Sequence, residues 1–223
     1  SLLEEKKSYS RAKAISYIEK SSDRIDSKCP YFDRCGGCSF GYVDYNRGLE
    51  YKKNIFIDIF KRYASIDINP SVMKSSKIFN YRNKISMKID NGKLSLTEED
   101  SNNLVNIDKC LLVNDNINCI IRLLNNLDLT GIKEVIIRGT TSIMVIINGE
   151  YDYNNIINLL KTKVSSIIYN GEVVYGEEYI TINVGNYKYA VYPDSFFQVN
   201  TDMISKLYDK VKEYAGVGES LLD

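Results

Sequence analysis

The stretch Ile85-Ser86-Met87-Lys88-Ile89-Asp90-Asn91-Gly92-Lys93-Leu94-Ser95-Leu96 indicates the kind of fold this chain adopts. On each side of its centre, apolar residues alternate with polar ones, which is the period of a strand with one buried face. The dipeptide Asn91-Gly92 is typical of a two-residue hairpin turn, because both residues accept positive φ angles. The stretch therefore predicts an antiparallel hairpin.

Further elements are predicted on both sides of this hairpin. Upstream, Asp44 is a typical helix N-cap, and a helix of about five turns follows it on the 3.6-residue period. The apolar patterns predict further strands over residues 9–18, 104–107, 135–137, 143–147 and 167–169, a second hairpin over 179–184 and 187–191, helices over 115–127, 151–160 and 201–214, and a strand beginning at 220–223. Because strands and helices alternate but include hairpins, the predicted fold class is α+β, or mixed α/β.

Composition bounds the class of protein. Hydrophobic residues make up 44% and charged residues 26% of the 223, as in ordinary soluble domains. No apolar run reaches the ~20 residues of a membrane-spanning helix, and the first residues do not resemble a signal peptide, so we expect a cytoplasmic protein. Residues 1–90 hold 18 Lys and Arg against 11 Asp and Glu, a charge of +7, although the whole chain is neutral. This basic part either contacts nucleic-acid phosphates or is an asymmetric solvated surface.

Three cysteines lie within ten residues, in Cys29-Pro30-Tyr31-Phe32-Asp33-Arg34-Cys35-Gly36-Gly37-Cys38. The two glycines allow a tight turn, so that neighbouring sulfurs can point at one centre. The spacing C-x5-C-x2-C favours a thiolate-bound metal or cluster over a set of free thiols. The chain contains no histidine, so any metal ligands here are thiolates or carboxylates, and a His-dependent nucleophile is excluded.

A fourth ligand has two candidates, Cys110 and Cys119. Cys110 follows a predicted strand and precedes a predicted helix, which is a plausible position for a ligand. Cys119 falls inside that helix beside isoleucines, where a cysteine is ordinarily a small core residue. We therefore expect Cys110 to be the ligand. Four thiolates suit both a [4Fe–4S] cluster and zinc.

Several separated segments also match the motifs of one family. They are the cysteine stretch of residues 29–38, Asp108-Lys109-Cys110-Leu111-Leu112, Tyr81-Arg82-Asn83-Lys84, Tyr192-Pro193-Asp194-Ser195-Phe196-Phe197-Gln198-Val199-Asn200 and Leu221-Leu222-Asp223. Together they resemble the iron–sulfur-containing uracil-5-methyltransferases that act on ribosomal or transfer RNA. The order and spacing of the segments cover nearly the whole chain. One departure is a histidine often found near the fourth ligand in that family, which is missing here.

The resemblance implies three parts. Residues 1–27 would be the end of a small OB-like RNA-binding β-barrel of the kind called TRAM. Residues 28–178 would be a central α/β domain whose iron–sulfur cluster is held by Cys29, Cys35, Cys38 and Cys110. Residues 179–223 would begin a Rossmann-like methyltransferase domain, with its first strand opening at Leu221.

The resemblance also implies roles for single residues. Gln198 matches a position that contacts S-adenosylmethionine, although a polar residue capping the next helix is the alternative. Phe196 matches an aromatic residue near the target base, and a core phenylalanine is the alternative. Arg82 and Lys84 would contact RNA, unless they are simply solvated. The family's nucleophilic cysteine and its catalytic base match positions beyond residue 223, so we expect no catalytic residue in this chain.

The function that the resemblance implies is methyl transfer from S-adenosylmethionine to C5 of a uridine in RNA, either 23S rRNA or tRNA. This chain would be a fragment that supplies the cluster and an RNA-binding surface and is inactive alone. We expect RNA as partner, no membrane and no obligate protein partner. The alternative is a non-catalytic RNA-binding module with a structural four-cysteine metal site. An electron-transfer protein is disfavoured, because ferredoxin-like chains pack their cysteines more densely.

Overall fold

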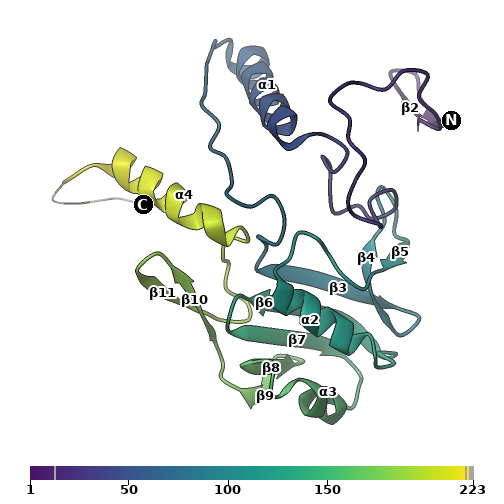
Figure 1. Ribbon diagram of the computed structural model, residues 1–223, viewed down its shortest axis with the longest axis vertical. Coiled ribbons are helices and arrows are strands. Elements are labelled where there is room, and N and C mark those ends of the chain that lie inside the picture. The colour runs from purple at the N-terminus through teal and green to yellow at the C-terminus, as the bar shows by residue number, and fades with distance from the viewer. Residues whose placement is uncertain (13, 219, 221–223) are drawn as a thin grey trace. The chain divides into compact units, whose positions relative to one another are not determined.

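The computed structural model describes residues 1–12, 14–218 and 220 (Figure 1). The chain forms two compact units. One consists of residues 1–28 and 40–72, and the other of residues 29–39 and 73–223. The strand predicted at Leu221-Leu222-Asp223 falls outside the described residues. No helix in the described part is long and apolar enough to cross a membrane.

The first unit begins with a short two-stranded ribbon. Strand β1 (Leu2–Glu5) pairs antiparallel with β2 (Ser10–Ala12). The single strand predicted over residues 9–18 is wrong for residues 14–18, which form no strand. Ala14, Ser16 and Ile18 are all exposed, so the alternation there has no buried face to support a strand.

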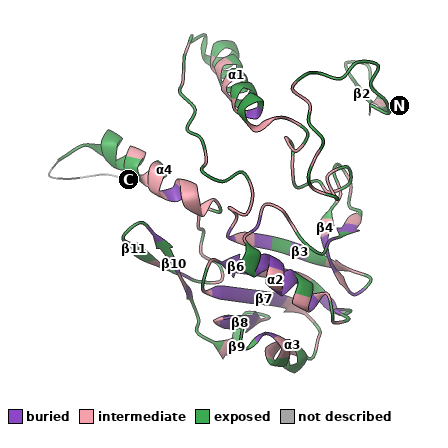
Figure 2. Cartoon of the chain, viewed as in Figure 1, coloured by how far each residue is buried: buried purple, intermediate pink, exposed green. Residues whose placement is uncertain are grey.

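Helix α1 (Tyr45–Ala64) confirms the predicted helix of about five turns. The Asp44 carboxylate accepts hydrogen bonds from the backbone N–H groups of Asn46 and Arg47, at 3.0 and 3.3 Å, which confirms the predicted N-cap. Gly48 is the buried residue of this helix, and several apolar side chains of its second half are exposed: Ile55, Phe56, Ile59 and Tyr63 (Figure 2).

The second unit is built on a seven-stranded mixed sheet with the order β5-β4-β3-β6-β7-β8-β9. The strands are β3 (Lys84–Asp90), β4 (Lys93–Thr97), β5 (Leu104–Asn106), β6 (Ile132–Gly139), β7 (Ile143–Gly149), β8 (Ser166–Tyr169) and β9 (Glu172–Gly176). All neighbours are antiparallel except β7 and β8. The β3–β4 hairpin turns as predicted, with φ angles of 49° at Asn91 and 72° at Gly92.

One face of the sheet is covered by α2 (Asp115–Leu124) and α3 (Tyr153–Leu160) (Figure 1). Helix α2 ends three residues before the predicted end. Asn125 leaves the helix, and its side-chain carbonyl accepts from Leu94 N–H at 2.9 Å while its amide donates to Ile107 C=O at 2.9 Å. Because these bonds fix the residue to β4 and its surroundings, the helix cannot continue through it.

The other face carries the hairpin of β10 (Ile180–Val184) and β11 (Tyr187–Val191) together with α4 (Thr201–Ala215). Strand β7 separates the two cores: Val145 and Ile147 pack with α2 and α3, while Met144 and Ile146 pack with the hairpin and α4. This alternation buries both faces of the sheet. The polar candidate residues consequently lie in the loops and at strand ends.

Candidate functional site

The cysteine loop, residues 29–39, is fixed by its backbone to the end of β4. Within the loop, Cys35 N–H donates to Tyr31 C=O at 2.7 Å. Gly36 N–H leaves the loop and donates to the C=O of Thr97 in β4 at 3.0 Å. A Cβ atom on Gly36 would lie only 3.0 Å from the Cα of Glu99. The glycine is therefore needed for the close approach of the two backbone segments.

Cys110 is held by a buried side chain of α2. Asn118 accepts from Cys110 N–H at 2.9 Å and donates to the carbonyls of Cys110 and Val113, at 3.0 and 3.3 Å. A second bond links this segment to the cysteine loop, because Asp108 N–H donates to the Tyr31 hydroxyl at 3.1 Å. The two segments that carry the four predicted ligands are thus joined by a direct hydrogen bond.

The four predicted ligand thiols interact electrostatically with one another. Burial raises the pKa of Cys35, and the thiols of Cys110 and Cys29 raise it further. Burial is also the main cause of the raised pKa of Cys38, followed by Cys110. Cys119 is half-buried on α2 and is not a cause of either shift. None of the five cysteines, all of which are described, is in a disulfide.

These thiols do not form a coordination shell in the structure as it stands. Among residues 1–12, 14–218 and 220, no group of three or more His, Cys, Asp or Glu side chains is arranged to hold a metal ion. The predicted ligand cysteines therefore lie close enough to interact with one another, but their metal remains a prediction. Thiols bind a metal as thiolates, so loading of this site would release protons.

The segment of residues 81–84 is centred on a buried amide. Asn83 is 2% exposed, and its side chain donates to Gln198 C=O at 2.9 Å and to the Thr201 hydroxyl at 3.0 Å. Its backbone N–H donates to Val199 C=O, and its carbonyl accepts from Gly139 N–H. Asn83 therefore joins strand β3, the end of β6 and the segment that leads into α4.

The two neighbours of Asn83, Arg82 and Lys84, are half-buried and not simply solvated. The Arg82 guanidinium partly offsets the rise that burial causes in the pKa of Cys38, and within the described part of the chain its Nε atom is buried without a hydrogen-bond partner. Burial lowers the pKa of Lys84, and the Arg138 guanidinium lowers it further. Both predicted RNA contacts consequently lie close to other charged or ionisable groups of the site.

The predicted contacts at Phe196 and Gln198 follow a turn at residues 192–195. Phe196 is 83% exposed, so the alternative of a core phenylalanine is wrong for the described structure. Gln198 is half-buried and does not cap α4, because the N-cap residue is Asn200. Neighbouring Phe197 packs on Tyr189 with ring centroids 5.6 Å apart and anchors the segment on β11.

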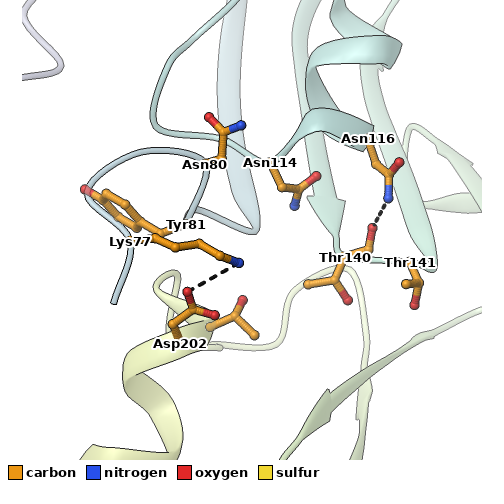
Figure 3. Close-up of a pocket in the computed structure, with 9 residues that line it drawn as sticks. Lys77, Asn80, Tyr81, Asn114, Asn116, Thr140, Thr141 and Asp202 are labelled. Atoms are coloured by element: carbon orange, nitrogen blue, oxygen red, sulfur yellow. Dashed lines mark hydrogen bonds and ion pairs between the residues drawn. The ribbon is translucent and has the colours of Figure 1, made fainter. Parts of the chain in front are cut away.

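A polar cavity of about 250 Å³ lies beside this segment (Figure 3). It is lined by Lys77, Asn80, Tyr81, Asn114, Asn116, Thr140, Thr141, Thr201 and Asp202. The lining carries no net charge, because Lys77 pairs with Asp202 at 3.4 Å and the remaining side chains are amides or hydroxyls. A neutral lining favours an uncharged ligand over a phosphate, although Asn80, Asn114 and Asn116 already donate to protein acceptors.

Three buried polar residues that organise the site are not identified by the motifs as positioning groups: Asn83, Asn118 and Arg138. Asn83 lies between two basic residues, whereas Asn118 and Arg138 sit in apolar patterns. Asn118 follows Ile117 on the buried face of α2, and Arg138 follows the apolar run that ends with Ile137. A polar residue at a buried position of a periodic pattern was the signal that could have revealed them, because such a group must find hydrogen-bond partners.

The proteins that match this chain along nearly all of its length are named RNA methyltransferases. An uncharacterized RNA methyltransferase of Clostridium acetobutylicum is 26% identical over 95% of this chain and 55% of its own length. Another, of Caldanaerobacter subterraneus subsp. tengcongensis, is 30% identical over 95% of this chain and 56% of its own length. The chain thus spans a little over half the length of these curated relatives. No family model matches it.

The same fold occurs in a solved structure. The tRNA (uracil-54, C5)-methyltransferase of Pyrococcus abyssi, solved in complex with S-adenosyl-L-homocysteine, superposes with a TM-score of 0.77 at 22% sequence identity. The superposition covers 98% of this chain and 57% of that one. The predicted mixed α/β class is therefore confirmed, and the architecture of this chain is shared with part of that methyltransferase.

Proposed function

We propose that the chain is part of an RNA methyltransferase that transfers a methyl group from S-adenosylmethionine to C5 of a uridine in 23S rRNA or tRNA. The observation that carries the proposal is similarity over 93–100% of this chain to proteins named RNA methyltransferases. The name of the solved protein, a tRNA (uracil-54, C5)-methyltransferase, supports the choice of base and atom. We expect such a protein to work in the cytoplasm, where its RNA is.

In this proposal the chain binds and positions RNA, and none of its five cysteines is the nucleophile. Four of them are assigned to a metal site. Cys119 lies on α2 beside the buried residues Ile120 and Asn118, which leaves it poorly placed to attack a base extruded from RNA. The nucleophile and the base of the reaction are assigned to parts of the relatives' length that this chain does not match.

The four thiols of Cys29, Cys35, Cys38 and Cys110 are proposed to hold a [4Fe–4S] cluster, with zinc as the alternative. Their chemistry fits, because all four donors are sulfur and lie within electrostatic range of one another. A bound cluster or zinc ion would supply positive charge that stabilises the thiolates. Its role here would be structural, tying the cysteine loop to the segment that precedes α2.

The RNA-binding surface is proposed to include Arg82, Lys84 and Phe196. Arginine and lysine supply phosphate contacts, and an exposed aromatic ring offers a face on which a base can stack. Gln198, two residues beyond Phe196, is proposed to contact S-adenosylmethionine. The neutral cavity beside Tyr81, of about 250 Å³, is proposed to take one base or ribose of the RNA.

Disruption of the gene tests the proposal. We expect one 5-methyluridine to disappear from rRNA or tRNA when modified nucleosides are mapped in the disrupted strain, and to return on complementation. Unchanged 5-methyluridine at every position, together with RNA binding by the purified protein, would favour the non-catalytic RNA-binding module. The same map identifies which RNA is the substrate.

A further inference from the structure

Arg138 is the bulkiest of the fully buried side chains, at 2% exposure. It is the last residue before Gly139, which ends the central strand β6. Its guanidinium donates three hydrogen bonds to backbone carbonyls: to Tyr192 at 2.9 Å, to Pro193 at 2.8 Å and to Ser195 at 3.0 Å. One side chain thus holds the whole turn of residues 192–195 against the sheet.

This arrangement is costly for stability alone. Among the described residues, the guanidinium donates only to backbone carbonyls and to no carboxylate, and its Nε atom is buried without a partner. Its register partner on β3 is Lys84, so two cations lie directly opposite each other. Asp194, on the turn itself, is the carboxylate that offsets both charges. A buried charge of this kind is a poor source of stability compared with a well-packed apolar residue.

The turn that Arg138 holds leads directly into the proposed contact residues. Within the turn, Ser195 N–H donates to Tyr192 C=O at 3.1 Å, and Tyr192 N–H donates to the Ser195 hydroxyl at 3.2 Å. Downstream, Asn83 binds the carbonyls of Gln198 and Val199. The segment is therefore anchored by one buried polar side chain at its start and by another at its end. Phe196 lies between these anchors with its ring exposed.

We propose that Arg138 is a positioning residue, which fixes the turn of residues 192–195 and thereby sets the orientation in which Phe196 meets RNA. The effect on RNA binding rests on the proposed function, whereas the anchoring of the turn does not. The inference goes beyond that function by assigning a role to a buried residue. A lysine cannot replace the guanidinium, because one ammonium nitrogen cannot reach the three carbonyls that the planar guanidinium contacts from two nitrogens.

Hydrogen exchange of the variant Arg138→Lys tests the anchoring. The amides of Tyr192 and Ser195 are expected to exchange about tenfold faster than in the parent chain. The reason is that the variant loses hydrogen bonds that oppose local opening of the turn. The amides of Val145 and Ile147 in β7 serve as internal references and are expected to keep their protection. Unchanged exchange in the turn would overturn the proposal.

Two further variants guard against a trivial result. Arg138→Met keeps the length of the side chain and removes the buried charge, so it reports on the turn if the lysine variant does not fold. It is expected to show the same faster exchange in the turn while β7 stays protected. Arg122→Lys, an identical change at an exposed position of α2, is the matched control and is expected to change nothing.

RNA binding by the same chain tests the consequence. Phe196→Ala is expected to weaken binding of a uridine-containing single strand by roughly tenfold, the loss expected for one stacked base. Arg138→Lys is expected to weaken it several-fold in the parent chain and less than twofold in the Phe196→Ala background, because both changes remove the same contact. Losses that multiply in the double variant would overturn the proposed route through Phe196.

The two failures are distinguishable. If the turn amides exchange faster but Phe196→Ala leaves RNA affinity unchanged, the RNA role of Phe196 in the proposed function is wrong and the anchoring by Arg138 stands. If Phe196→Ala weakens binding while the turn is as protected in Arg138→Lys as in the parent chain, the positioning role is wrong and the RNA surface stands.

Discussion

Replacing Asn118 with leucine should destabilise the second unit and loosen Cys110 at the same time. The side chain is 7% exposed and makes three hydrogen bonds, to Cys110 N–H, Cys110 C=O and Val113 C=O. Leucine has nearly the same size, so the substitution leaves little empty space. Its main effect is to leave one backbone donor and two backbone acceptors without partners.

The expected loss follows from these contacts. Each backbone group left buried without a partner costs about 1–3 kcal/mol, and the bond to Val113, at 3.3 Å, belongs at the lower end. Burying the added methyl groups of leucine returns about 1–2 kcal/mol. The three groups together cost about 3–7 kcal/mol, so the net free energy of unfolding should fall by about 1–6 kcal/mol, with a central value of about 3 kcal/mol. With a urea dependence of about 2–3 kcal/mol per molar, the unfolding midpoint shifts down by about 1 M.

Urea unfolding followed by pulsed hydrogen exchange at peptides of β6 and β7 measures this shift within the second unit. Asn126→Leu, an exposed change two residues beyond α2, is the control and should move the midpoint little. A shift in Asn118→Leu no larger than that of the control would refute the reasoning. So would an unchanged exchange rate for the Cys110 amide, because that amide loses its acceptor in the variant.

Three more predictions concern the metal site, RNA binding and pH. Changing any one of the four proposed ligand cysteines to serine should remove iron from anaerobically purified protein, as measured by metal analysis, whereas Cys119→Ser should leave the iron in place. Stoichiometric zinc in colourless protein would show that the metal is zinc and not a cluster, with the same four ligands. The purified chain should bind single-stranded RNA more weakly as salt rises and transfer no labelled methyl group to it, and label at uracil C5 would contradict the assignment of the nucleophile elsewhere. Hydrogen bonds from the Thr130 hydroxyl and, to a smaller extent, from its backbone amide lower the pKa of Asp128. The ionised carboxylate therefore stabilises the fold above its ordinary pKa, and this contribution is lost as the pH falls through the lowered pKa. An NMR titration of Thr130→Val should show a higher pKa for Asp128.

Local patterns predicted the elements that depend on neighbouring residues. The turn at Asn91-Gly92 is correct because those two residues accept positive φ angles whatever surrounds them. The cap at Asp44 is correct for a similar reason, since its carboxylate reaches the N–H groups two and three residues ahead. The choice of Cys110 over Cys119 as the fourth ligand stays a prediction, since the pKa shifts show only that Cys110, and not Cys119, interacts with Cys35 and Cys38.

Features that depend on distant partners escaped the sequence patterns. Strand β9 exists because Glu172–Gly176 pairs with β8, and its own residues are largely exposed. Helix α2 ends early because the Asn125 side chain binds groups far away in the sequence. The roles of Asn83 and Arg138 likewise depend on backbone carbonyls more than 50 residues further along the chain. A periodic pattern can mark such residues as out of place but cannot name their partners.

The course of the chain between its two units has a consequence for how the protein is handled. Residues 29–39 fold with the second unit, although the residues before and after them belong to the first. The polypeptide therefore enters each unit twice, and no single cut separates the units into two continuous pieces. Removing residues 1–28 would leave the first unit with only part of its chain, and excising the first unit would require joining residue 39 to residue 73. An expression variant of the second unit alone needs a designed linker at that junction, and the cysteine loop must be kept on its N-terminal side.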